Sequence, residues 1–494
     1  MEPTTISLHT GFAIGRVDPR LFGGFAEHMG RCIYEGLYDP TSPHADEDGF
    51  RGDVLEALRG LDMTVMRYPG GNFASGYRWT DGIGPRENRP TVLDLAWNSR
   101  EPNAFGTDEF LRLCRKMHWA PMLTVNLGTG SPAEARDWVE YCNRPPGTRW
   151  ADRRAENGAA DPHGVKLWCL GNEMDGPWQL GHVPADQYAI RAAQAAKMMK
   201  DVDPSIEVVA CGSSGPTMPT FCQWDRQVLE VLGDQADYVS LHRYVGNAAD
   251  DTADYLAVTN AIDAQIEAVD AVCRFVQARR RGAKRTYLCF DEWNVWYKTR
   301  QMDGAGQAAP HLIEEAYNLE DALVVAGFLN SFIRHADVVK IANLAQVVNV
   351  IAPILTDGER MLLQSSFDVF AMYSRRRAGV SLRPAVGGPG YDAKTHGRAN
   401  TIDAAAILGP DVLHVFATNR HQTDAAPVKI DLADRAIRRF ENGEILTGPD
   451  AKAANSFDAP DLVRCRPMDA VAVADGSAEV KLPPLSAAAM TFRL

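Results

Sequence analysis

The sequence predicts a (β/α)8 TIM barrel followed by a C-terminal antiparallel β-sandwich of jelly-roll type. Eight short apolar segments lie between residues 21 and 344, and most are followed by a helix-like stretch. Strands that alternate with helices form parallel sheets, and eight such units over this length close into a barrel. Beyond residue 375 the pattern changes to short strands separated by turn residues, which is typical of a sandwich.

The barrel strands are expected to be short and buried on both faces. The fourth segment shows this most clearly, because Lys166 is its only charged residue and Gly171 follows it directly. The predicted strands are 21–25, 64–68, 121–125, 165–170, 206–210, 238–241, 286–290 and 338–344.

Amphipathic stretches between these strands predict the outer helices. Helical spacing of apolar residues indicates helices at 52–60, 108–117 and 184–201. A further helix is expected to begin after Asn318, which is a good N-cap residue, with Glu320 and Asp321 at the positive end of the helix dipole.

The C-terminal part reads as strands joined by turns. Apolar segments at 401–408, 412–419, 428–432, 470–473, 480–482 and 489–494 are the predicted strands. Residues 5–10 alternate polar and apolar, and chain ends often lie close together, so this strand is expected to join the sandwich. The predicted domains are a catalytic barrel over residues 13–375 and a sandwich over residues 1–12 and 376–494.

Composition excludes several classes of partner. The 51 Lys and Arg against 64 Asp and Glu give a net charge of −13, which disfavours nucleic acid and anionic membranes. No apolar run is long enough to span a membrane, and the N-terminus lacks the pattern of a signal peptide. Nine cysteines without CxxC spacing indicate buried thiols in a reducing cytoplasm. No nucleotide loop, and no histidine pair of metal-binding spacing, is present, so no cofactor and no metal are expected.

Polar residues recur where the predicted barrel strands end. They are Glu27 and His28, Arg67 and Asn72, Asn126, Asn172 and Glu173, His242 and Tyr244, Glu292, and Asn343 and Gln346. A single Glu after a strand is more often a first-turn helix residue, and Trp97, Trp178 or Trp296 alone would be taken for packing residues. The stability of a packed barrel does not require polar residues at the same end of nearly every strand. This end is where barrel enzymes collect their reactive groups, so the joint pattern indicates a functional site.

Two of these groups suit the hydrolysis of glycosides. Retaining glycosidases use two carboxyl groups about 5 Å apart, one as acid/base and one as nucleophile. Glu173 and Glu292 end strands four and seven, and these ends face the same mouth. Asn172 is placed to bond a sugar hydroxyl, Tyr244 to orient the nucleophile, and His242 to contact the acid or a hydroxyl. Trp296 is a candidate platform for a sugar face.

The chain resembles the family 51 glycoside hydrolases, the intracellular α-L-arabinofuranosidases. The stretches that carry the resemblance are GFAEHMGRCIYEG (24–36), RYPGGNF (67–73), LGNEMDGPWQ (170–179), SLHRY (240–244), FDEWNVWY (290–297) and ANLAQVVN (342–349). Asn-Glu at a strand end is common to many barrel glycosidases, whereas the first and fifth stretches are specific. Arg243 departs from the family pattern, in which a neutral residue such as Gln is expected.

The resemblance implies a retaining double displacement with Glu173 as acid/base and Glu292 as nucleophile. It also implies that Trp97 closes one side of the pocket, and that the enzyme removes terminal arabinofuranose from arabinan- or arabinoxylan-derived oligosaccharides as a homo-oligomer, commonly a hexamer. The residues implied to hold the terminal arabinofuranose are Glu27, Asn72, Asn172, Tyr244 and Gln346.

Two alternatives remain open from the sequence. The first is another retaining barrel glycosidase, such as an endo-β-glucanase or a β-xylosidase, which an open groove would favour. The second is a non-catalytic carbohydrate-binding or scaffold protein, because a fold alone does not imply an activity.

Overall fold

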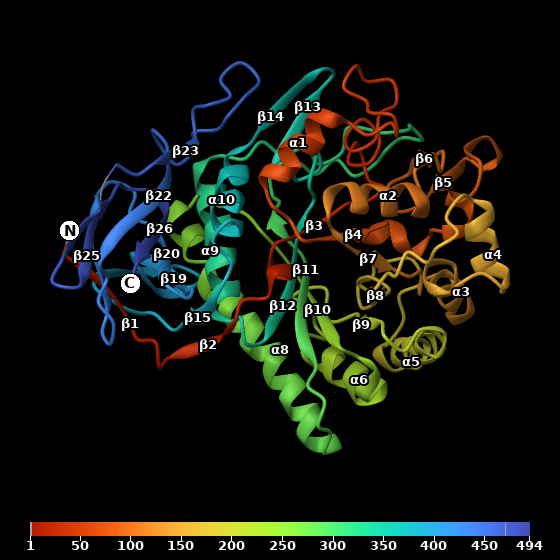
Figure 1. Cartoon of the computed structure of the whole chain (residues 1–494), viewed down its shortest axis with the longest axis horizontal. Helices are drawn as coiled ribbons and strands as arrows, with labels where there is room; N and C mark the ends of the chain where they lie inside the picture. Colours follow the sequence, from red (N-terminus) through yellow and green to blue (C-terminus); the bar gives the residue numbers. More distant parts are fainter. Residues whose placement is uncertain (1, 470) are drawn as a thin grey trace.

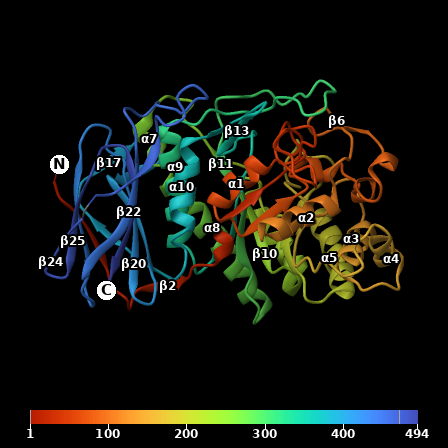
Figure 2. The same cartoon turned by 45° about the horizontal axis from the view of Figure 1, so that its top comes forward.

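The computed structural model describes residues 2–469 and 471–494 and consists of a barrel and a β-sandwich side by side (Figure 1). The sandwich holds both chain ends, and helices α9 and α10 lie between it and the barrel in both views (Figure 2). No helix in the described part of the chain combines the length and the apolar character needed to cross a membrane.

The barrel is closed by eight parallel strands in the order β10-β11-β12-β3-β4-β7-β8-β9. The strands are β3 (Gly23–Phe25), β4 (Val65–Tyr68), β7 (Ala120–Thr124), β8 (Leu167–Leu170), β9 (Glu207–Ala210), β10 (Tyr238–Val245), β11 (Tyr287–Val295) and β12 (Val339–Ala345). Each overlaps one predicted segment, which confirms the (β/α)8 fold. The sequence prediction ended β10 and β11 too early, because polar residues there still pair in register, as in His242 with Glu292 and Tyr244 with Asn294.

Ten α-helices accompany the barrel in the described part of the chain, and the four predicted ones correspond closely to α1, α2, α5 and α9. They are α1 (Gly52–Gly60), α2 (Thr107–Met117), α3 (Pro132–Asn143), α4 (Arg149–Glu156), α5 (Ala185–Val202), α6 (Gln223–Leu232), α7 (Thr252–Leu256), α8 (Thr259–Arg280), α9 (Leu319–Arg334) and α10 (Ser365–Ser374). Short 3₁₀ turns lie at Pro19–Leu21, Asn72–Ser75, Trp79–Gly82, Arg86–Asn88 and Gly233–Gln235. The predicted cap is confirmed: the Asn318 side chain accepts a hydrogen bond from the backbone N–H of Asp321 at 3.0 Å.

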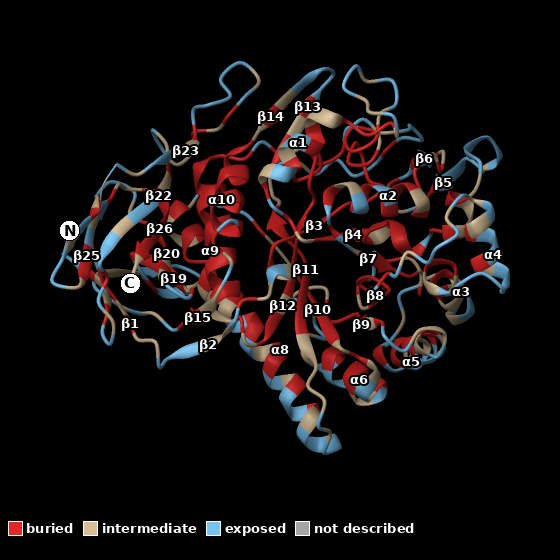
Figure 3. Cartoon of the chain, viewed as in Figure 1, coloured by how far each residue is buried: buried red, intermediate tan, exposed pale blue. Residues whose placement is uncertain are grey.

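Helices α9 and α10 are buried on all sides, whereas the ends of α6 and α8 are exposed (Figure 3). Helix α9 contacts β11 of the barrel and β19 of the sandwich, and α10 contacts β22 and β23. A helix that is apolar around its whole circumference needs such a position between two layers. These two helices therefore join the barrel to the sandwich through a shared core.

The sandwich packs a seven-stranded sheet, β2-β15-β19-β20-β26-β22-β23, against a five-stranded sheet, β16-β1-β21-β25-β24. Its strands are β1 (Thr4–Leu8), β2 (Ala13–Arg16), β15 (Val380–Leu382), β16 (Ala385–Gly387), β19 (Ile402–Leu408), β20 (Val412–Asn419), β21 (Ala426–Leu432), β22 (Arg439–Thr447), β23 (Arg464–Pro467), β24 (Ala472–Ala474), β25 (Ser477–Leu482) and β26 (Ser486–Arg493). Three hairpins outside both units are β5–β6 (Val92–Asp94 and Ser99–Glu101), β13–β14 (Ile354–Asp357 and Arg360–Leu363) and β17–β18 (Gly390–Ala393 and Gly397–Asn400).

The predicted C-terminal domain of antiparallel sheets is confirmed, and the N-terminal strand joins it. Strand β1 pairs antiparallel with β16 but parallel with β21. No hairpin connects β1 to β21, so the direction of this chain end is not constrained. Strand β22 was not predicted, because its Asn442-Gly443 resembles a turn and its pairing with β26 is irregular at this point.

The proposed division at residues 12/13 and 375/376 stays a prediction. The pairing of β2 with β15 places residues 13–16 in the seven-stranded sheet. Ala470, where one predicted strand begins, lies outside the described residues.

Candidate active site

The carboxyl ends of the barrel strands bring the predicted carboxylates together. Glu292 lies within β11, and His242 pairs beside it on β10. Glu173 follows β8 after Gly171, whose φ of +85° lets the chain turn sharply, and Glu173 itself has a φ of +44°. A non-glycine residue in this left-handed region marks a conformation imposed by its surroundings, and such residues cluster at functional sites.

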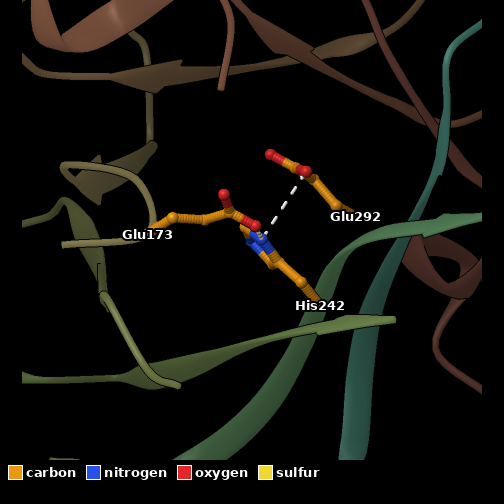
Figure 4. Close-up of side chains that lie close together, drawn as sticks. All are labelled: Glu173, His242 and Glu292. Carbon is orange, nitrogen blue, oxygen red and sulfur yellow. Dashed lines mark hydrogen bonds and ion pairs between the residues drawn. The ribbon is translucent and has the colours of Figure 1, made fainter. Parts of the chain in front are cut away.

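Glu173 and Glu292 approach each other across His242 (Figure 4). The Nδ1 atom of His242 lies 2.9 Å from Oε1 of Glu173 and 3.5 Å from Oε2 of Glu292. One oxygen of each carboxylate and one imidazole nitrogen all lie within 4.8 Å of one another. This separation matches retaining glycosidases at about 5–5.5 Å and not inverting ones at about 6.5–9.5 Å.

Both oxygens of Glu292 accept hydrogen bonds. Arg67 Nη1 donates to Oε1 at 2.7 Å, and the Tyr244 hydroxyl donates to Oε2 at 2.9 Å. Arg67 also donates from Nη2 to Asn172 Oδ1 at 2.7 Å, and its Nε lies 3.2 Å from Asp291 Oδ2. One guanidinium thus fixes three side chains, two from β11 and one that follows β8, as expected for an anchor of carboxylates.

Asp291 and Glu292 are consecutive, yet both reach His242. Asp291 Oδ1 lies 3.3 Å from His242 Nε2, while Glu292 approaches the other ring nitrogen. Successive residues of a regular strand point to opposite faces, but the pairing of β11 with β12 shifts register between Phe290 and Trp293. This irregularity explains why sequence periodicity did not reveal Asp291 as part of the site.

The charges of this cluster balance. Burial opposes protonation of His242, but Glu292 and Asp291 outweigh it and raise its pKa well above the ordinary value. Burial works against the Asp291 carboxylate, but Arg67 and His242 outweigh it and lower its pKa. Burial raises the pKa of Glu292, and His242 and Arg67 oppose this rise. Two cations, Arg67 and His242, therefore face two buried anions.

A second cluster forms around Glu27. Its Oε1 accepts hydrogen bonds from the Phe73 backbone N–H at 3.0 Å and from Trp97 Nε1 at 3.2 Å. Its Oε2 accepts one from Gln346 Nε2 at 3.2 Å. Burial, followed by repulsion from Glu292, raises the pKa of Glu27 to about 8. These contacts hold three of the predicted sugar-binding residues together on one side of the mouth.

A cavity of about 520 Å³ opens over both clusters. Nine of the ten predicted site residues line it: Glu27, Asn72, Trp97, Glu173, His242, Tyr244, Glu292, Trp296 and Gln346. The tenth, Asn172, is buried between Arg67 and Gln179 and does not line the cavity.

Several other residues line the cavity, among them Trp178, which was interpreted from the sequence as a packing residue. Trp178 donates from Nε1 to Glu173 Oε2 at 2.5 Å, although its side chain is 52% exposed. Its position five residues after Glu173 was the available signal. Residues 214–217, after β9, and Met302 also line the cavity, and their sequences carry no such signal.

Glu173, His242 and Glu292 are also close enough to be considered as metal ligands. The donors already in place argue against this role. Arg67, Tyr244 and Trp178 donate to the carboxylate oxygens, and the raised pKa of His242 favours the imidazolium, which has no lone pair for a metal. The hydrogen-bond donors around these residues therefore fit a protonated histidine at this position better than a bound metal ion.

Comparison with known proteins agrees with this geometry. The model of the "Alpha-L-arabinofuranosidase 1 domain" matches residues 57–259, and that of the "Alpha-L-arabinofuranosidase C-terminal domain" matches residues 291–486. The intracellular exo-α-(1→5)-L-arabinofuranosidase 1 of Bacillus subtilis is 46% identical over 471 residues, covering 94% of each chain. An exo-α-(1→6)-L-arabinofuranosidase of Bifidobacterium longum is 40% identical over 503 residues, covering 98% of this chain and 96% of the relative.

Among solved structures, AbfB, a family 51 α-L-arabinofuranosidase from Bifidobacterium longum, superposes with a TM-score of 0.95 at 38% identity and with full coverage of both chains. The barrel, the carboxylate pair and these relatives define a glycoside hydrolase. The chain belongs to the family 51 α-L-arabinofuranosidases. The alternatives of an endo-β-glucanase, a β-xylosidase or a non-catalytic binding protein are not supported.

Proposed function

We propose that this α-L-arabinofuranosidase removes terminal arabinofuranosyl residues by a double displacement in which Glu292 is the nucleophile and Glu173 the acid/base. The observation that carries this assignment is the short separation of the two carboxylates. Each carboxylate is also held in place by hydrogen bonds. Glu292 is oriented by Arg67 and Tyr244, and Glu173 is bonded to His242 and Trp178.

In the first step, Glu292 attacks the anomeric carbon while Glu173 gives its proton to the leaving oxygen. The C–O bond to the aglycone breaks, and an ester forms between arabinose and Glu292. With Glu173 protonated, the charges of Arg67 and His242 balance those of Asp291 and Glu292. In the second step, Glu173 takes a proton from water, which attacks the ester and releases arabinose with retained configuration.

The mouth of the barrel suits an enzyme that acts on chain ends. The loop after Trp97 is tied to the loop after β11: Gly304 N–H donates to Trp97 O at 2.7 Å, and Asn98 Nδ2 donates to Asp303 Oδ1 at 2.7 Å. Arg100 N–H donates to Gln307 O at 2.8 Å. This bridge closes one side of the cavity beside Glu27, so a terminal residue fits better than the interior of a chain.

The proposed substrates are arabinofuranosyl-containing oligosaccharides derived from arabinan or arabinoxylan. Glu27, Asn72, Tyr244 and Gln346, which line the cavity, are proposed to hold the terminal arabinofuranose. Asn172 does not line the cavity, so its proposed bond to a sugar hydroxyl requires its amide to turn from Gln179 toward the substrate. Relatives bear names that specify (1→5) and (1→6) linkages. We therefore propose an exo-acting enzyme. Its preference for one linkage is determined by residues other than those that hold the terminal arabinofuranose.

A cytoplasmic location and a homohexamer are part of the proposal. Several relatives are named intracellular enzymes, and all nine cysteines are unpaired, with most of them buried. The hexamer rests on resemblance to the family. Light scattering coupled to size-exclusion chromatography distinguishes a hexamer from smaller species, and a monomer would refute this part.

The test is hydrolysis of an aryl α-L-arabinofuranoside by the wild type, Glu173→Ala and Glu292→Ala, with azide added to each variant. Both variants are expected to lose activity on the order of a thousandfold or more. Azide should give the retained α-azide with Glu173→Ala and the inverted β-azide, if any, with Glu292→Ala. The opposite pairing of products would exchange the two roles, and an inert wild type would overturn the proposed activity.

A further inference from the structure

Arg243 is a half-buried cation without an acidic partner. It lies between His242 and Tyr244 on β10 and contributes to the cavity lining. All hydrogen bonds that its side chain makes within the described chain run from Nη1, to Gln265 Oε1 at 3.1 Å and to Ala261 O at 3.4 Å. Among residues 2–469 and 471–494, no Asp or Glu forms an ion pair with its guanidinium.

The other cations of the site differ in this respect. Arg67 is paired with Asp291 and Glu292, and His242 with these two and Glu173. Arg243 Nε is buried and has no hydrogen-bond partner in the described chain. Burial lowers the pKa of Arg243 to about 10, and no neighbouring carboxylate opposes this effect. The side chain is still cationic at neutral pH, and a partly desolvated charge without a counter-charge loses hydration without compensation.

The order of the strands places Arg243 on the aglycone side of the cavity. Of the residues proposed to hold the terminal sugar, Glu27, Asn72 and Gln346 follow the neighbouring strands β3, β4 and β12. Asn172 follows β8, and Tyr244 lies on β10 with its hydroxyl directed to Glu292. Glu173, which protonates the leaving oxygen, follows β8, and β8, β9 and β10 are neighbours on the other half of the closed barrel. The leaving group therefore extends toward β10, where Arg243 lies.

A guanidinium group binds a carboxylate better than it binds a neutral sugar. Its planar set of N–H donors matches a carboxylate with two parallel hydrogen bonds, whereas a neutral sugar needs no charge. The protein carries a net charge of −13, so an acidic substrate approaches a repulsive surface unless a local cation attracts it. Arg243, an arginine in the cavity lining without an acidic partner, supplies such a local positive charge.

We propose that Arg243 binds a carboxylate on the aglycone, so that the enzyme favours arabinofuranosides attached to uronic-acid-bearing oligosaccharides over neutral ones. This proposal rests on the proposed function, because it takes the position of the leaving group from the role of Glu173. Arg243 is a specificity-determining residue and not part of the bond-breaking machinery.

The test compares two aryl α-L-arabinofuranosides that carry a carboxylate or a carboxamide at the same ring position. The measured quantity is the ratio of their kcat/KM values in the wild type, Arg243→Gln and Arg243→Lys. We expect this ratio to fall on the order of tenfold or more in Arg243→Gln, as for loss of a charge-assisted hydrogen bond, and less in Arg243→Lys. Differences in leaving-group reactivity, and any loss of folded enzyme, cancel in this comparison.

Arg300→Gln is the matched control. Arg300 is exposed and stacks over Trp296 at 5.2 Å from the ring centroid, so its loss removes the same charge near the cavity without removing Arg243. Its ratio should stay within about twofold of the wild type, because an exposed charge is screened by salt. In the wild type, added salt should lower the ratio.

Two results would overturn the proposal: an unchanged ratio in Arg243→Gln, or an equal fall in Arg300→Gln. A failure of the proposed function has a different signature, since the wild type would then hydrolyse neither aryl arabinofuranoside. If Arg243→Gln does not fold, the Arg243→Lys ratio and the salt dependence of the wild type decide the question. A wild-type ratio that does not respond to salt, together with an unchanged ratio in Arg243→Lys, would refute the role of Arg243.

Discussion

Replacement of His242 by Asn should move the acidic limb of the pH–activity profile to higher pH. The imidazolium of His242 faces Glu173, Asp291 and Glu292 at 2.9, 3.3 and 3.5 Å. Removing this cation leaves Arg67 as the only positive charge beside two buried anions. The ionised form of Glu292 then loses stabilisation, so its pKa, already raised by burial, rises further.

The size of the shift follows from the distance between the charges. Two unit charges about 4 Å apart interact by about 4 kcal/mol at an effective dielectric constant of about 20, which corresponds to roughly three pKa units. Water that enters the space vacated by the imidazole reduces this value. We therefore expect a shift of about one to three pH units, and the shifted limb belongs to the carboxylate cluster as a whole.

The assay is the pH dependence of kcat/KM for an aryl α-L-arabinofuranoside, which reports the ionisation of the free enzyme. His335→Asn is the control, because His335 lies at the end of α9 and faces Asp263 and Glu267. Its profile should match that of the wild type. An acidic limb that stays in place in His242→Asn would show that His242 does not carry the charge assigned to it.

Three further outcomes follow from the same geometry. Tyr244→Phe removes a hydrogen bond to the Glu292 carboxylate, so kcat/KM should fall roughly 10- to 150-fold with an unchanged thermal midpoint. Gly71→Ala would place a Cβ 2.8 Å from Glu292 Oε1, and steady-state kinetics should show a loss on the order of a hundredfold, whereas Gly387→Ala, whose Cβ meets nothing within 4 Å, should be neutral. Arg67→Met leaves two buried carboxylates with His242 as their one remaining cation, and chemical denaturation should show a loss of about 3–5 kcal/mol of unfolding free energy. A wild-type kcat/KM in Tyr244→Phe or Gly71→Ala, or a wild-type unfolding free energy in Arg67→Met, would contradict the corresponding contact.

Much of the barrel was predictable because its strands are short, apolar and followed by polar residues. Glu173 and Glu292 stand out where an apolar run ends in a carboxylate, and the structure brings them together over His242. Strand and helix boundaries were less predictable where polar residues continue a strand, as at His242 and Tyr244 in β10. There, tertiary pairing overrides local composition.

Other parts of the site depend on irregular pairing, loop conformation and long-range packing that sequence patterns do not encode. Asp291 faces the cluster only because the pairing of β11 is irregular, and Trp178 reaches Glu173 from an otherwise exposed loop position. The bridge between the loops that carry Trp97 and Asp303 joins segments more than 200 residues apart. The parallel pairing of the N-terminal strand with β21 was also not predictable from the sequence, because a chain end can pair in either direction.

The central claim is that arabinose becomes covalently attached to Glu292. The most direct measurement is intact-protein mass spectrometry of Glu173→Ala mixed with an aryl α-L-arabinofuranoside that has an activated leaving group, followed by peptide mapping. Because this variant lacks the base for the second step, the account predicts a mass increase of one anhydroarabinose unit on the peptide that contains Glu292. A label on any other residue, or arabinose released with inverted configuration and no label, would contradict it.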